Sequence, residues 1–216
     1  MTKLSQAIAL ATAMTAGLVG TTAVQAEVSY NAAVTSNYVW RGDAQGSDTT
    51  ALQGGIDYEH ESGVSAGIWT SSLAGDTETD YYAAFSGEAG DVSYSIGAIA
   101  YDYNNDAADF SEVNASVGMM GASFTYNRKV SDNDDDKTTD DASYISLGYS
   151  LGLADDLGLD LAYGQTIDAN NEDSKADKYD VLVSLTKSLP EFDFSVTATD
   201  KEDGENELFI TVAKSF

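Results

Sequence analysis

The sequence predicts an all-β protein, a transmembrane antiparallel up-and-down β-barrel of about 12 strands. Three observations support this fold class. Apolar and polar residues alternate in twelve runs between residues 28 and 216, the connectors between the runs alternate between long and short, and the last residue is a phenylalanine. Because successive side chains of a strand point to opposite faces, each run can present one apolar face and one polar face.

The first 26 residues have the pattern of a secretory signal peptide. Lys3 supplies a positive charge, residues 7–19 are apolar, and the segment ends on the small residue Ala26. We therefore expect a signal peptide at 1–26 and a single barrel domain at 27–216. No 18-residue apolar run follows, which excludes a helical membrane protein.

The remaining composition fits a chain of paired strands. The only proline, Pro190, lies in a predicted tight turn, and the absence of cysteine excludes a disulfide-stapled scaffold. Thirteen tyrosines fit the aromatic belts of a membrane barrel, although a secreted β-sandwich would also accommodate them.

Connector length alternates along the chain. The longer connectors are 42–49, 72–78, 102–110, 131–141, 167–178 and 200–205, and the shorter ones are 61–63, 87–91, 120–121, 152–157 and 188–191. A soluble sandwich has no reason to sort its loops in this way. A membrane barrel does, because odd and even connectors reach different compartments, and we expect short periplasmic turns and long acidic extracellular loops.

The first strand, 28–41, shows the alternation most clearly. Its apolar face would hold Val28, Tyr30, Ala32, Val34, Tyr38 and Trp40, and its polar face Ser29, Asn31, Thr35, Asn37 and Arg41. The strands within 159–164, 179–186 and 192–199 repeat the pattern. In the third and fifth strands Trp69, Ile99 and Tyr101 fall on the polar face, either as plugs of the lumen or because the register is wrong by one.

The polar faces would be costly inside a dry protein core, whereas a lumen with water or polar networks accommodates them. In lipid every backbone group must be paired, so the sheet must close, and termini on one side require an even number of strands. The predicted pore-lining residues are Asn31, Asn37, Arg41, Asp57, Glu112, Lys129, Asp160 and Asp180.

The last strand, 208–216, ends in Phe216 and carries apolar residues at alternate positions, including Ile210 and Val212. It resembles the C-terminal recognition strand of bacterial outer-membrane barrels, and this resemblance implies that the barrel-assembly machinery recognises these residues. Lys214 interrupts the apolar row, which is tolerable if its long side chain reaches the interface.

The formal net charge of −26 excludes nucleic acid as a partner, and most of the 36 acidic residues lie in or beside the six longer connectors. Two explanations remain open. The acidic residues solvate the loops, for example in a salty habitat, or they recruit cations as bridges to lipopolysaccharide or as a funnel to a pore.

A short motif near residue 40 consists of Ser36, Tyr38, Arg41, Gly42 and Gln45. It resembles the opening signature of the TorF-type porins, a proteobacterial family, although Ala44 replaces the usual serine. The resemblance implies an outer-membrane barrel and a pore, and it supplies no substrate, cofactor or catalytic residue.

Arg41 is the member of this motif with the clearest chemistry. It falls on the predicted polar face in a chain with only 10 Lys and Arg residues, so carboxylates should surround it. A guanidinium pairs with carboxylates in a fixed fork geometry. Arg41 is either a latch that holds the first connector against the wall or a selectivity contact at a constriction.

No catalytic residues, cofactor or confident metal site are predicted. The only histidine, His60, lies at a short turn, away from the end at which a Ser-His-Asn barrel phospholipase would work. The run at Asp132, Asp134 and Asp136 departs from a calcium loop at Lys137 and Ser143, and leaves only weak divalent binding open.

Our leading hypothesis is an outer-membrane porin for passive diffusion of small hydrophilic solutes, with a preference for cations because inward carboxylates outnumber inward cations. The expected partners are outer-membrane lipid, lipopolysaccharide, the assembly machinery and small solutes or cations. The alternatives are a non-conducting structural or surface-recognition barrel with divalent-binding acidic loops, and a secreted soluble β-sandwich. The sequence predicts no oligomeric state.

Overall fold

A computed structural model gives the architecture and describes residues 26–46, 49–104, 108–132, 142–168, 178–202 and 204–216. Residues 1–25, which hold nearly all of the predicted signal peptide, lie outside the described residues. Within the described part of the chain, no helix is long and apolar enough to cross a membrane.

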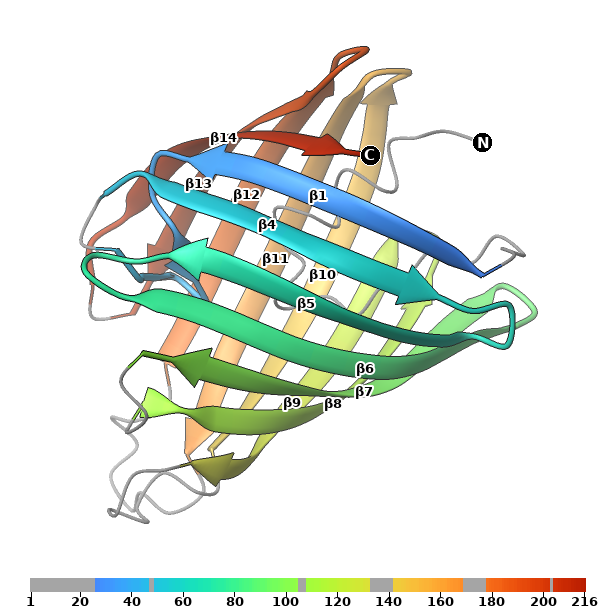
Figure 1. The fold of residues 1–216 in the computed structure, drawn as a ribbon. Coiled ribbons are helices and arrows are strands. Elements are labelled where there is room, and N and C mark those ends of the chain that lie inside the picture. Colours follow the sequence, from blue (N-terminus) through green and yellow to red (C-terminus); the bar gives the residue numbers. More distant parts are fainter. Residues whose placement is uncertain (1–25, 47–48, 105–107, 133–141, 169–177, 203) are drawn as a thin grey trace.

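Twelve antiparallel strands form a closed barrel (Figure 1). In chain order they are β1 (Glu27–Thr35), β4 (Ala51–Glu59), β5 (Val64–Ser72), β6 (Thr77–Ala89), β7 (Val92–Tyr103), β8 (Phe110–Met119), β9 (Ala122–Asp132), β10 (Ala142–Ala154), β11 (Leu157–Asp168), β12 (Lys178–Ser188), β13 (Asp193–Lys201) and β14 (Glu207–Ser215). Each strand pairs with its neighbours in the chain, and β1 pairs with both β4 and β14. The predicted up-and-down topology and strand number are confirmed.

The seam between β1 and β14 closes the sheet. Asn31 faces Ser215 and Thr35 faces Thr211 in this register. Beyond the last pair, Phe216 donates its backbone N–H to the carbonyl of Tyr30 at 2.9 Å. The residues of the predicted assembly signal are Ile210 and Val212 on β14 and Phe216 directly after it, and all three are exposed.

The outside of the barrel wall is apolar and its inside is polar, which is the reverse of a soluble protein. On β12, Val183 is 42% exposed, whereas the adjacent Ser184 is 1% exposed. The largest fully buried side chains of the described residues are Glu78, Thr197, Asp80, Ser71 and Ser184, all polar. A β-sandwich would instead pack two apolar faces against each other, so that alternative is wrong.

The register of the third and fifth strands is the one that the alternation predicts. Trp69 on β5 lies opposite Asp80, and Asp80 lies opposite Tyr101 on β7. Ile99 lies opposite Glu112. Since Asp80 and Glu112 are buried in the lumen, the apolar residues at these positions fill the lumen and do not signal a register slip.

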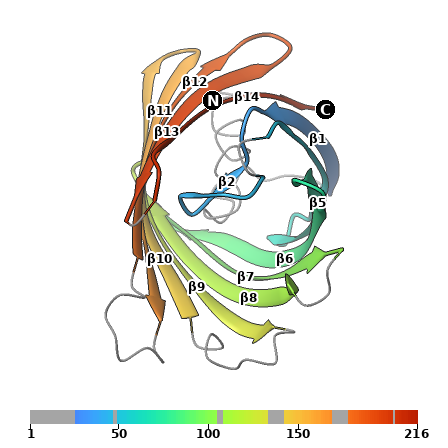
Figure 2. The ribbon, with the colours of Figure 1, turned by 90° about the vertical axis from the view of Figure 1, so that its left-hand side faces the viewer.

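The prediction that the first strand runs to residue 41 is wrong. The wall strand ends at Thr35, and Ser36 makes the last contacts with β14: its N–H donates to the carbonyl of Ile210, and its Oγ accepts from the N–H of Ile210. The chain then turns into the barrel, where β2 (Val39–Trp40) and β3 (Asp43–Ala44) form a small separate sheet (Figure 2). Tyr38 and Trp40 therefore lie inside, and not on the outward face.

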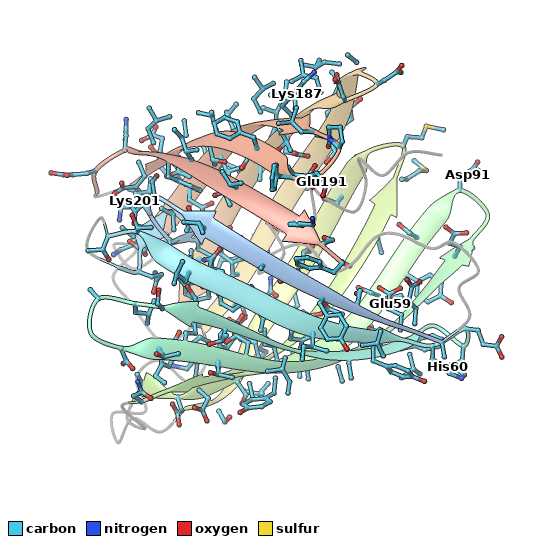
Figure 3. The ribbon with its side chains drawn as sticks, turned by 45° about the horizontal axis from the view of Figure 1, so that its top comes forward. Glu59, His60, Asp91, Lys187, Glu191 and Lys201 are labelled. Atoms are coloured by element: carbon cyan, nitrogen blue, oxygen red, sulfur yellow. The ribbon has the colours of Figure 1, made fainter. Side chains whose placement is uncertain are left out.

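The short turns share one end of the barrel with the start of β1 and the end of β14. Figure 3 places His60 and Asp91 at this end and Lys201 at the other. A hydrogen bond from Lys187 lowers the pKa of the Asp156 carboxyl in one of these turns. Lys214 reaches Glu191 in another turn and lies beside the Phe216 ring, as expected for a lysine at an interface.

Candidate functional site: the lumen and the inward hairpin

The segment 36–46, called here the inward hairpin, occupies the lumen (Figure 2). Val39 pairs with Ala44, and Trp40 with Asp43. The turn between them uses left-handed backbone at Arg41 (φ 48°) and Gly42 (φ 78°). A Cβ at Gly42 would lie 2.9 Å from the Cβ of Asp180, so the glycine also permits close approach to the wall.

Four side-chain contacts attach the inward hairpin to four different wall strands. Tyr38 donates its hydroxyl to Glu78 on β6 at 3.1 Å, and Asn37 donates to Glu207 on β14 at 3.1 Å. Lys201 on β13 donates to Asp43. Arg41 forms a bidentate ion pair with Glu112 on β8, with distances of 2.8 and 2.7 Å.

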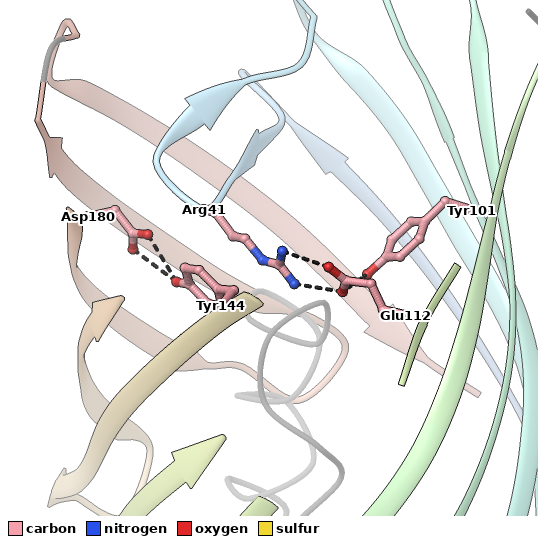
Figure 4. Close-up of polar contacts among 5 residues, drawn as sticks. All are labelled: Arg41, Tyr101, Glu112, Tyr144 and Asp180. Atoms are coloured by element: carbon pink, nitrogen blue, oxygen red, sulfur yellow. Dashed lines mark hydrogen bonds and ion pairs between the residues drawn. The ribbon is translucent and has the colours of Figure 1, made fainter. Parts of the chain in front are cut away.

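The Arg41–Glu112 pair lies in a mostly aromatic enclosure (Figure 4). The guanidinium carbon lies 4.2 Å from the ring centroids of both Trp40 and Tyr144. The side chains of Arg41 and Glu112 are only 9% and 4% exposed. Burial opposes the charge of Arg41, but the Glu112 carboxylate outweighs it and the pKa of Arg41 is raised, so the guanidinium stays charged.

Tyrosine hydroxyls hydrogen-bond the wall carboxylates in a repeated arrangement. Besides the contact between Tyr38 and Glu78, Tyr101 donates to Glu112 at 3.3 Å, Tyr144 donates to Asp180 at 3.0 Å, and Tyr82 donates to Asp57. These tyrosines lie in the lumen and not in interfacial belts. The sequence predicted an inward position for Tyr101, as a possible plug of the lumen, but not the hydrogen bonds of these tyrosines to wall carboxylates. Tyr82 and Tyr144 alternate in phase with the inward residues of their strands.

The eight predicted pore-lining residues all face the interior. Asn31 donates to Asp57 at 3.1 Å, and Asp160 accepts from Ser150 at 2.6 Å. Lys129 lies over the ring of Phe110. Asn37 and Arg41 belong to the inward hairpin and not to the wall. Glu112 and Asp180 are wall residues, and they accept hydrogen bonds from Arg41 and Tyr144. Contact of these residues with a permeating solute stays a prediction.

Glu78 and Asp80 are lumen carboxylates that the sequence prediction missed. Residue 78 was assigned to a connector, but β6 begins at Thr77 and buries both carboxylates. Glu78, Asp80 and Tyr82 stand at alternate positions, and this pattern could have indicated that all three share the inward face of β6.

The residues of the short motif all contribute to the inward hairpin or its attachment. Ser36 ends the wall strand, Tyr38 and Arg41 bind wall carboxylates, and Gly42 forms the turn. Gln45 closes the hairpin, donating its N–H to the carbonyl of Tyr38 at 2.7 Å. The motif therefore specifies a folded obstruction inside the barrel.

Two cavities, of about 130 and 280 Å³, border the inward hairpin. Trp40, Arg41 and Asp180 line both of them. The larger cavity lies toward the long-connector end, since Lys178, Lys201 and Glu202 also line it. A solute crossing the barrel would have to pass the layer that contains Arg41.

Among the described residues no group of three or more His, Cys, Asp or Glu side chains is arranged to hold a metal ion. The weak divalent site considered at Asp132, Asp134 and Asp136 cannot be located: Asp134 and Asp136 lie outside the described residues, and of Asp132 only the backbone is described, as the last residue of β9.

The fold and the site define a class: a closed twelve-stranded barrel with an apolar exterior and a polar lumen that an inward hairpin partly fills. Residues 20–215 match a family model described as bacterial protein of unknown function (Gcw_chp). The chain belongs to this family. A search of curated proteins found no match.

Solved structures share the fold. The KdgM porin superposes with a TM-score of 0.59 at 9% identity, covering 88% of this chain and 98% of that one. The COG4313 outer membrane channel from Pseudomonas putida F1 superposes with a TM-score of 0.55 at 12% identity, covering 93% and 99%. At such low identity the similarity concerns the fold alone.

Proposed function

We propose that this protein is an outer-membrane channel for passive diffusion of small hydrophilic solutes, with a preference for cations. The observation that carries the proposal is the inversion of polarity, with apolar side chains covering the outside of a closed barrel and polar side chains filling its inside. Lipid solvates the first face, and water and small polar solutes are compatible with the second.

The charges of the lumen support a preference for cations. Among the described residues, the inward carboxylates include Asp57, Glu59, Glu78, Asp80, Glu112, Asp160, Asp180, Asp193 and Glu207, whereas the inward cations are fewer and include Arg41, Lys129, Lys178 and Lys201. Carboxylate-lined pores favour cations.

The same geometry supports one rival function, a non-conducting barrel that acts as a structural or surface-recognition element. The inward hairpin is attached to four strands, and its central ion pair is nearly inaccessible to solvent. Of the two roles considered for Arg41, the contacts support the latch. If the latch never releases, the inward hairpin remains in the lumen and obstructs it.

The cellular setting belongs to the same proposal. A signal peptide at 1–26, export to the outer membrane, recognition of the last strand by the barrel-assembly machinery, and contact with lipopolysaccharide would follow from a membrane barrel. The similarity to barrels titled as porins and as an outer membrane channel supports this setting. We further propose that the TorF-type porins and the family matched here are the same family.

Single-channel recording in planar bilayers tests the proposal. We expect discrete conductance steps, small for a barrel of this size, and a reversal potential under a salt gradient that indicates selectivity for cations. Steps with an anion-selective reversal potential would refute the preference for cations. Membrane-inserted protein that never opens a channel would refute conduction and favour the rival function.

A further inference from the structure

Glu78 and Asp80 form a pair of buried carboxylates on one face of β6. They are 2% and 0% exposed. Residues two apart on a strand share a face and lie roughly 6.6 Å apart along it, so both side chains enter the same part of the lumen. Four other carboxylates of the lumen (Asp57, Glu112, Asp160 and Asp180) have hydrogen-bond donors, and Glu112 has an arginine.

Three of the four oxygens of this pair have no hydrogen-bond partner in the structure. Tyr38 donates to one oxygen of Glu78, and the hydroxyl of Tyr103, the cross-strand neighbour of Glu78 on β7, interacts with the same carboxylate. The second oxygen of Glu78 and both oxygens of Asp80 are buried and unpaired. The ion pairs found among the described residues do not include either carboxylate. A buried charge without a counter-charge is strongly unfavourable, so such groups are paired, coordinate a metal or become neutral.

The surroundings of Asp80 explain its burial without supplying a counter-charge. Its neighbours across the sheet are Trp69 and Tyr101, and the inward hairpin lies against both rings. Tyr101 directs its hydroxyl to Glu112 and not to Asp80. Asp80 is therefore a buried carboxylate without a hydrogen-bond partner, and it lies between two aromatic residues.

We propose that Glu78 and Asp80 bind one divalent cation, Ca²⁺ in particular, inside the lumen. The site offers two negative charges and three free carboxylate oxygens, which match a hard dication. Since Ca²⁺ accepts six to eight oxygens in irregular geometry, water and neutral protein oxygens would complete its shell. The bound ion would also hold β6 and, through Tyr38, the inward hairpin together. This proposal rests on the lumen geometry and does not require conduction.

Terbium luminescence tests the site directly, because Tb³⁺ replaces Ca²⁺ and emits when an excited aromatic ring is near. The only tryptophans are Trp40 and Trp69, and both lie in the lumen. Excitation of tryptophan should therefore not sensitise emission from Tb³⁺ bound at the acidic connectors. We expect the folded full-length protein in detergent to give tryptophan-sensitised emission that Ca²⁺ abolishes by competition.

Asp80→Asn and Glu78→Gln should each reduce this emission about tenfold at a fixed Tb³⁺ concentration, as expected for loss of one of two charged ligands. The matched control is Asp193→Asn, an inward carboxylate at the short-turn end, which should emit like the wild type. Ca²⁺ should raise the unfolding temperature of the wild type and of Asp193→Asn, but not of Asp80→Asn.

Two results would overturn the proposal. One is sensitised emission that Asp80→Asn and Glu78→Gln leave unchanged. The other is a wild-type protein without Ca²⁺-sensitive emission or thermal shift, which would mean that protons alone neutralise the pair. A variant has folded if its unboiled sample migrates in detergent gels like the unboiled wild type and differently from its own boiled sample.

Discussion

At the residue scale, the lumen stabilises its charges through specific partners and not through water alone. Arg41 and Glu112 neutralise each other, and Tyr38 and Tyr144 donate to Glu78 and Asp180. A buried ion pair is strongly coupled, because removal of one member leaves the other charged and unpaired. The stability of the lumen should therefore depend on individual residues.

Arg41→Ala should destabilise the barrel by about 3–5 kcal/mol, because it leaves Glu112 buried and charged. Addition of Glu112→Gln should restore part of this loss, and a double-mutant cycle of denaturant unfolding in detergent measures the coupling. The control is Lys187→Ala, which removes an exposed pair with Asp156 and should change stability little. Equal effects of the lysine and arginine substitutions would contradict the latch.

Gly164→Ala should destabilise the protein by about 1–3 kcal/mol through overpacking. A Cβ at this position would lie 1.9 Å from the hydroxyl of Tyr144 and 2.6 Å from Asp180, so the ring must move and its hydrogen bond must break. Gly152→Ala is the matched control, because nothing lies within 4 Å of its added carbon. Unfolding midpoints of the two variants should differ clearly, and identical midpoints would be evidence against the observed packing.

The inward-facing residues of single strands could be predicted from alternation, but their partners could not. The pattern predicts correctly that Asn31, Asp57 and Asp180 face inward. It cannot indicate that Tyr82 crosses to Asp57, or that Tyr144 crosses to Asp180, because these contacts depend on glycines of neighbouring strands. Gly67 leaves room for the ring of Tyr82, and Gly164 leaves room for Tyr144.

At the element scale, the inward hairpin is the feature that the sequence pattern concealed. The alternation of Val34, Tyr38 and Trp40 continues in phase beyond the end of β1, so the first strand appeared longer than it is. The turn at Arg41 and Gly42 requires left-handed backbone, which a strand excludes. A Gly in the motif was therefore the one local sign that the chain leaves the wall.

Replacement of residues 37–45 by a short Gly-Ser linker should increase single-channel conductance severalfold while the barrel still folds. The twelve wall strands pair without this segment, so only the obstruction and its tethers are lost. A Gly-Ser replacement of residues 73–76, a connector on the same end between β5 and β6, serves as control and should leave conductance unchanged. Conductance that is identical in both variants would show that the inward hairpin does not limit flow.

The outward face of each strand should tolerate charge only near the ends of the barrel. Val183 lies at the middle of β12, and Val183→Arg should cost about 2–4 kcal/mol of folding free energy in lipid, whereas Met120→Arg at the turn after β8 should cost about 0–1 kcal/mol. Folding titrations into lipid vesicles give both values. Equal costs at the two positions would argue against a membrane position for β12.

At the scale of the whole molecule, the chain combines an acidic composition with a barrel whose exterior is apolar. The net charge of −26 is compatible with membrane insertion because the outward face of the wall is largely uncharged, and the charged side chains lie in the lumen, at the barrel ends or in connectors. Closure was predictable, since an open edge in lipid would leave backbone groups unpaired. The content of the lumen was not, because it depends on a segment that leaves the sheet.

The central claim is that alternate residues of the wall contact lipid and the lumen. The chain has no cysteine, so single-cysteine variants along β12 can carry a spin label without background. In lipid vesicles, labels at 181, 183 and 185 should be accessible to oxygen dissolved in the bilayer, and labels at 182, 184 and 186 should not, giving a period of two. Accessibility that does not alternate, or protein that remains soluble without detergent, would contradict the claim.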